Sequence, residues 1–144
     1  WTLVPTILVL WVVLQSLVPL RHIAIEGSSS WTEEGHRFAW HMMLRDKSGT
    51  ARFTLTDGEH TWTVDPADLL TKDQLRELAW YPEHLVQFAH HLSSVHGGAE
   101  VRADTSVTLN GRDPQPNDDP TIDLAAVPTT WWGHAPWIVH LNTG

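Results

Sequence analysis

Residues 1–20 carry no charged side chain, and this run constrains the fold more than any other feature of the chain. A helix of twenty residues is about 30 Å long, which matches the hydrocarbon core of a bilayer. Trp1 and Trp11 suit positions at or near a membrane interface, where tryptophan is enriched. The polar side chains within the run are those of Thr2, Thr6, Gln15 and Ser16.

Three interpretations of this run compete. A signal peptide would need a Met start, a basic region and a cleavage site of small residues, and the chain begins at Trp1 with none of these. A buried helix of a soluble protein is the second alternative. The third, a membrane helix that lacks its first residues, fits best and suggests a piece of a longer protein. We therefore predict the end of a transmembrane helix at 1–20 and a soluble extracytoplasmic domain at 21–144, which makes the chain a membrane protein.

The charge and the cysteine content exclude several classes of function. All 17 acidic and nine basic residues follow the apolar run, and the formal net charge is −8. This balance argues against a general nucleic-acid binder, which needs a basic patch to displace counterions from phosphates. The chain has no cysteine, so disulfides, zinc ribbons, thiol catalysis and iron–sulfur ligation are excluded.

Alternating patterns predict antiparallel strands in the first half of the soluble part. Apolar and polar residues alternate over 36–44 and again over 51–56, the period of a half-buried strand. Residues 46–49 read as a turn between these strands. The Asp-Gly pair at 57–58 is a hairpin signal, and 61–64 completes a three-stranded meander.

Two helices are predicted after the meander. Thr71 and Gln74 form a capping box, so a first helix starts at Lys72. Pro82 fits the first turn of a second helix, which the glycines at 97–98 end. The apolar face of the second helix has the helical spacing of Leu85, Phe88, Ala89 and Leu92.

Extended structure is predicted again after the helices. Residues 101–109 alternate as a long strand that ends at an Asn-Gly turn, and 112–120 is a proline-rich loop. The aromatic tail 131–141 reads as a closing strand or a packed extended segment. The fold class is therefore α+β, mainly antiparallel β and sandwich-like, with a two-helix insert and one preceding transmembrane helix. The pattern does not separate an α+β domain from a β-sandwich with a helical insert.

Five ordered segments resemble the vitamin K-dependent γ-glutamyl carboxylase family. WTEEGHRFAWHMM at 31–43 resembles its W-T…[YF]-[SA]-W-x-M-M signature, and PLRH at 19–22 resembles its exit from the membrane. TLNGR at 108–112, DPTIDLA at 119–125 and WIV at 137–139 follow in the family's order. The bacterial relatives carry the same membrane module, called HTTM. The resemblance implies the last membrane helix plus the C-terminal extracytoplasmic domain.

The resemblance also implies what the chain lacks. In the family, oxygenated vitamin K hydroquinone yields a strong base, the γ-proton of a glutamate is removed, and CO2 adds to the carbanion. The lysine that starts this chemistry lies in membrane helices outside this chain, and neither Lys47 nor Lys72 sits in an apolar helix that could depress its pKa. We therefore expect no catalytic residue and no cofactor in this chain. Its expected role is to present an acidic, glutamate-containing peptide or protein.

The W-T…W-x-M-M segment is associated with substrate binding in the family. On that basis, the candidate substrate-binding residues are Trp31, His36, Arg37, Trp40, His41 and Arg45. The alternation itself places Arg37, His41 and Arg45 on one accessible strand face. Residues four apart on a strand lie roughly 13 Å from each other, so the stripe suits an extended acidic peptide rather than one carboxylate. The alternatives are a solvated strand face for the cations, and core packing rather than a platform near the membrane for Trp31 and Trp40.

Other candidate sites are weaker. The chain has ten histidines, but His84 and His91 are spaced i, i+7 and no HExxH motif is present, so no metal site is predicted. The acidic residues of the 113–123 loop are typical of turn capping and solubility. Two further functions compete with the carboxylase-like one: a non-enzymatic β-rich module whose exposed tryptophans stack on ligands, and a metal-dependent hydrolase built on the histidine-rich insert.

Overall fold

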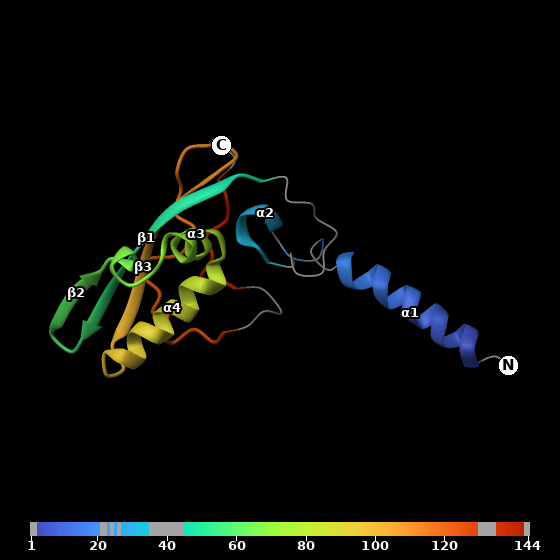
Figure 1. The fold of residues 1–144 in the computed structure, drawn as a ribbon, viewed down its shortest axis with the longest axis horizontal. Coiled ribbons are helices and arrows are strands. Elements are labelled where there is room, and N and C mark those ends of the chain that lie inside the picture. Colours follow the sequence, from blue (N-terminus) through green and yellow to red (C-terminus); the bar gives the residue numbers. More distant parts are fainter. Residues whose placement is uncertain are drawn as a thin grey trace.

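The structure is a computed structural model that describes residues 3–20, 23, 25, 27–34, 45–129 and 135–142. Figure 1 shows a three-stranded sheet with two helices packed over one face, and a separate N-terminal helix that projects away from them. This arrangement confirms the predicted α+β class with a preceding apolar helix.

The N-terminal helix α1 (Leu3–Leu20) is apolar on every side. Most of its large apolar side chains are 46–71% exposed, Val18 is half-buried, and Pro19 is its buried residue. By length and composition it is the one helix of the described residues that could cross a membrane. The predicted apolar helix is therefore confirmed.

The sheet has the strand order β2-β1-β3 and is antiparallel throughout. β1 (Lys47–Asp57) and β2 (His60–Val64) form the predicted hairpin, where Gly58 adopts a φ of +58°. β3 (Glu100–Leu109) pairs with the other edge of β1. The described strands form one open sheet, and a second sheet of the kind a sandwich needs is not among the described residues.

The turn predicted at 46–49 is wrong, because β1 already begins at Lys47. Gly49 is not a turn residue but pairs with Val107 of β3. A Cβ atom at this position would lie 2.7 Å from the carbonyl oxygen of Ser106, so glycine is required where the two strands approach closely. The strand predicted at 36–44 lies outside the described residues.

Both predicted helices are present with the predicted caps. α3 (Lys72–Trp80) begins with a reciprocal capping box between Thr71 and Gln74. α4 (Pro82–Val95) has Pro82 in its first turn, where the missing N–H costs nothing. Two short elements were not predicted: the helix α2 (Ser29–Thr32) and a 3-10 turn, η2 (Pro66–Asp68).

The core lies between the sheet and the helices α3 and α4. The rings of Phe53 on β1 and Phe88 on α4 meet edge to face, with centroids 5.0 Å apart. Trp137 and Ile138 of the tail are buried in the same core, so part of the predicted packed tail is confirmed. A second, smaller cluster joins α2 to the far end of β3 through Trp31, Val107 and Leu109.

Candidate functional site

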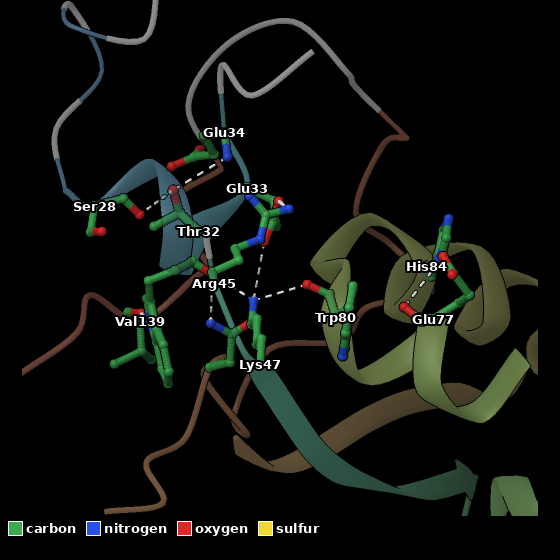
Figure 2. Close-up of polar contacts among 12 residues, drawn as sticks. Ser28, Thr32, Glu33, Glu34, Arg45, Lys47, Glu77, Trp80, His84 and Val139 are labelled. Atoms are coloured by element: carbon green, nitrogen blue, oxygen red, sulfur yellow. Dashed lines mark hydrogen bonds and ion pairs between the residues drawn. The ribbon is translucent and has the colours of Figure 1, made fainter. Parts of the chain in front are cut away.

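The structure describes two of the six candidate substrate-binding residues. Trp31, in α2, and Arg45, just before β1, are brought to the same place beside Glu33 and Lys47. Figure 2 shows Arg45, Glu33 and Lys47 together. The other four lie outside the described residues: His36, Arg37, Trp40 and His41.

Glu33, Arg45 and Lys47 form a buried charge cluster. Arg45 Nη2 donates a hydrogen bond to Glu33 Oε2 over 2.7 Å, and Lys47 Nζ lies 3.8 Å from Glu33 Oε1. The three side chains are 5%, 0% and 7% exposed for Arg45, Lys47 and Glu33 respectively. The attraction between them is therefore not screened by solvent, but each charge has also lost most of its hydration.

Lys47 connects three elements through its ammonium group. Nζ donates to the carbonyl oxygen of Trp31 over 2.7 Å and to that of Trp80 over 2.9 Å. These carbonyls belong to the C-terminal turns of α2 and α3, where helix carbonyls have no intrahelical partner. Lys47 Nζ also lies 5.5 Å from the centroid of the Trp31 ring, within cation–π range. One side chain thus satisfies the ends of two helices from the first residue of β1.

Burial shifts the pKa values of the cluster. Desolvation raises the pKa of Glu33 to about 7, against the lowering effect of Lys47 and Arg45, and Glu83 of α4 adds to the rise. Desolvation lowers the pKa of Lys47 to about 8, against the raising effect of Glu33. Lys47 does not lie in an apolar helix, but its buried position in β1 desolvates the amine and lowers its pKa in the same way.

Glu33 also has an unusual backbone conformation. It ends α2 in the left-handed region, with φ +62° and ψ +1°. This conformation is costly for any residue with a Cβ atom, and glycine or asparagine usually occupies such a helix end. The side chain of Glu33 and its ion pairs are therefore held at the expense of backbone strain.

Trp31 is part of the core rather than of an exposed platform. Trp31 is 1% exposed, and its Nε1 donates a hydrogen bond to the carbonyl oxygen of Val139 over 2.7 Å. The expected accessibility of Arg45 is also wrong, because Arg45 turns inward to Glu33. Core packing determines the placement of Trp31, and the ion pair with Glu33 determines that of Arg45. The alternation along a strand therefore did not predict either placement.

The other described tryptophans of the folded part are likewise largely covered. Trp137 is 7% exposed, and Trp62 and Trp80 are half-buried. This burial argues against the alternative of a ligand-binding module that stacks ligands on exposed indoles.

Lys47 is not placed to act as a base. Two of its three N–H donors are engaged by carbonyl oxygens and the remaining side faces Glu33. A general base must reach the proton that it removes, and no surface of this side chain is open to a substrate. The contacts of Lys47 in the cluster are therefore structural.

A second buried polar group lies on the face of β3 that also carries Val107 and Leu109. Thr105 Oγ1 donates to Asp118 Oδ1 and accepts from the backbone N–H of Asn117 over 2.9 Å. Burial raises the pKa of Asp118 to about 6. Two turn-capping carboxylates of the same loop behave as expected: Asp119 accepts from the N–H of Thr121, and Asp123 from that of Val101. The expectation of a solvated acidic loop is wrong for Asp118 alone.

Within the described ranges, no group of three histidine or acidic side chains is placed to hold a metal ion. His90 of α4 instead bonds the carbonyl oxygen of Val127 over 2.8 Å. His84 bonds the carbonyl oxygen of Glu77 over 3.2 Å, in the neighbouring α3 (Figure 2).

Glu33 and Lys47 are the site residues that sequence reasoning missed. A signal for Lys47 exists in retrospect, because it stands in phase with Phe53 and Leu55 on the buried face of β1. No comparable periodic signal marks Glu33, since α2 is a single turn.

These features define an α+β domain with a preceding apolar helix, in which α2 is tied to β1 by Lys47. Over residues 2–144 the chain matches the family described as the vitamin K-dependent gamma-carboxylase, lumenal domain. The chain therefore belongs to this family, and the resemblance read from the five sequence segments is confirmed. No curated protein and no solved structure gives a significant match.

Proposed function

We propose that this chain is the substrate-binding lumenal domain of a carboxylase-like membrane protein, and that it binds acidic, glutamate-containing peptides. The family match over residues 2–144 is the observation that carries the proposal. In this arrangement α1 lies in the membrane, and the sheet and its helices stand on the lumenal or periplasmic side.

The charge cluster supports a specific form of the proposal. The ion pair between Glu33 and Arg45 joins two positions twelve residues apart. The intervening segment carries Arg37 and His41, and its two ends are therefore anchored in the folded domain. Because Glu33 already neutralises Arg45, the cations left for a peptide carboxylate are those between the anchors.

The carboxylation chemistry of the intact protein is not assigned to residues of this chain. Vitamin K hydroquinone would need free hydrogen-bonding groups in an apolar setting. The charged groups Arg45 Nη2 and Lys47 Nζ of the described site bond Glu33 and two backbone carbonyls. We therefore propose that this cofactor binds elsewhere in the intact protein.

The test is peptide binding by the full-length protein in lipid nanodiscs. A fluorescent Glu-rich peptide is titrated at low and at high salt, and binding by the wild type is expected to weaken as salt rises. The double variant Arg37→Glu/His41→Glu is expected to bind at least about tenfold more weakly, since two attractive contacts become repulsive.

A matched control separates recognition from bulk charge. Arg52 and Arg112 are exposed and lie outside the segment, so Arg52→Glu/Arg112→Glu makes a similar change in net charge. This control is expected to bind as the wild type does. Unchanged affinity in the folded Arg37/His41 variant, or an equal loss in the control, would overturn the proposal.

A further inference from the structure

The docking of α2 depends on the buried ring of Trp31, which packs with Val107 and Leu109, and on a few polar contacts. α2 has four residues, and a helix of one turn is not stable by itself. It is held by the hydrogen bond from Lys47 to Trp31 O, the bond from Trp31 Nε1 to Val139 O, and the pairing of Glu33 with Arg45 (Figure 2). These contacts join α2 to β1 and to the C-terminal segment, so α2 docks or leaves as one unit.

The docked state carries two costs at the same residue. Glu33 is in the left-handed backbone region, at φ +62°, and its carboxylate is buried. Both costs are released if Glu33 swings into solvent, where it regains hydration and an ordinary backbone conformation. The contacts of the cluster hold α2 against this release.

We propose that the Glu33–Arg45–Lys47 cluster is a pH-dependent latch, in which Glu33 and α2 leave the sheet together more readily at neutral than at mildly acidic pH. The proposal concerns the described junction and does not require that the domain bind a glutamyl peptide. It gives this membrane-proximal turn a position that depends on the pH of its compartment.

The sign follows from proton linkage. In the docked state burial raises the pKa of Glu33 to about 7, and once exposed to solvent the carboxyl returns to the ordinary value near 4.5. The docked state therefore binds the proton more tightly, and loss of that proton as pH rises favours release. A protonated, neutral carboxyl tolerates burial, whereas the ionised one gains hydration by leaving.

The other charged groups around Glu33 do not reverse this sign. β1 and the residue before it supply Lys47 and Arg45, α4 supplies Glu83, and Glu34 adjoins in sequence with its carboxylate on the N–H of Ala135. The segment 135–142 adds His140, which lies beside Gly27. The pKa of Lys47 is lowered only to about 8, so its ammonium stays mainly charged in both states below that pH. Above that pH its neutralisation favours docking again.

The experiment is hydrogen–deuterium exchange of the full chain in nanodiscs, read on a peptide that covers residues 28–34. After correction for intrinsic exchange rates, protection of this peptide is expected to fall roughly 20-fold between about pH 5.5 and about pH 7.5, a figure that follows from the two pKa values of Glu33. Peptides from α4 serve as the internal control for global unfolding and are expected to lack this drop.

Glu33→Gln tests the assignment, because glutamine keeps the shape of the side chain and does not titrate. Its protection at 28–34 is expected to be independent of pH, while the matched exposed variant Glu100→Gln keeps the wild-type profile. A wild-type profile that is flat, or that falls equally in α4, overturns the latch. A fall that persists in a folded Glu33→Gln protein overturns the role of Glu33, and the wild-type comparison remains decisive if that variant does not fold.

Discussion

The two lysines of the chain offer a direct test of the charge cluster. Lys47 is fully buried at the start of β1, whereas Lys72 is exposed in the first turn of α3. Methionine has nearly the length of lysine without its charge, so Lys47→Met removes the ammonium and leaves most of the packing. Lys72→Met makes the same chemical change at the surface.

The expected magnitude comes from the groups that Lys47 leaves behind. The carbonyl oxygen of Trp80 loses its donor, and that of Trp31 keeps only the longer bond from Asn117 Nδ2. A buried carbonyl without a partner costs about 1–3 kcal/mol. Glu33 keeps its ion pair with Arg45 but loses its contact with the Lys47 ammonium. The cost of removing that ammonium from water on folding is also absent in the variant, which offsets part of the loss. Breaking a buried ionic cluster from one side costs about 3–5 kcal/mol, and we expect Lys47→Met to fall in this range. Lys72→Met is expected to change stability by less than about 0.5 kcal/mol.

The assay is urea unfolding of the full chain in detergent, followed by tryptophan fluorescence at neutral pH. The difference in midpoint between the two variants converts to a free energy with the common slope. A loss below about 1 kcal/mol for a folded Lys47→Met protein would refute the assignment of Lys47 as the common donor to both helix ends. The double variant Lys47→Met/Glu33→Gln is expected to lose less than the sum of the two single variants, because each single variant already removes the contact between Lys47 and Glu33.

Two further outcomes follow from single contacts elsewhere. Thr71→Ala is expected to lower the free energy of unfolding by about 1 kcal/mol, because the capping box of α3 loses its hydroxyl acceptor, and a loss near zero in urea unfolding would contradict this role. Asp118→Asn is expected to reduce the pH dependence of stability: burial raises the pKa of Asp118 from 3.8 to about 6, so this carboxyl contributes a loss of up to about 3 kcal/mol as pH rises through the interval, and the variant lacks that contribution. Unfolding curves at several pH values between those limits measure it, and parallel profiles of wild type and variant would contradict the prediction.

Local rules predicted most of the elements in the described part of the fold. The capping box at Thr71, the proline at the start of α4 and the Asp-Gly hairpin each act within a few residues, so their signals are complete in the sequence. The prediction of a turn at 46–49 failed because Gly49 is required for the close approach of β3, a strand that lies far along the chain. Sequence patterns cannot report such a close approach before the partner strand is known.

The candidate site was harder to predict, because its charges violate the usual pattern of burial. Lysine and glutamate are rarely buried, so a sequence interpretation places Lys47 and Glu33 at the surface. The structure buries both, and pairs them across elements that are separated in sequence. Arg45 was correctly chosen as a site residue, but its side chain was expected to face solvent and instead turns inward. Alternation along a strand gives no information about an ion pair with α2, a short helix that was not predicted.

The position of Trp31 and Thr32 separates the family signature into two physical parts. Both residues are buried, and Trp31 donates to Val139 while its carbonyl oxygen accepts from Lys47. The Trp-Thr end of the signature is therefore a structural anchor, whatever the later residues bind. A substitution at Trp31 that weakens peptide binding would act by undocking α2, and it would lower stability at the same time. A substitution at Arg37 that acts on the peptide directly would leave stability unchanged. Measuring both quantities on the same variants distinguishes anchoring from recognition within one motif.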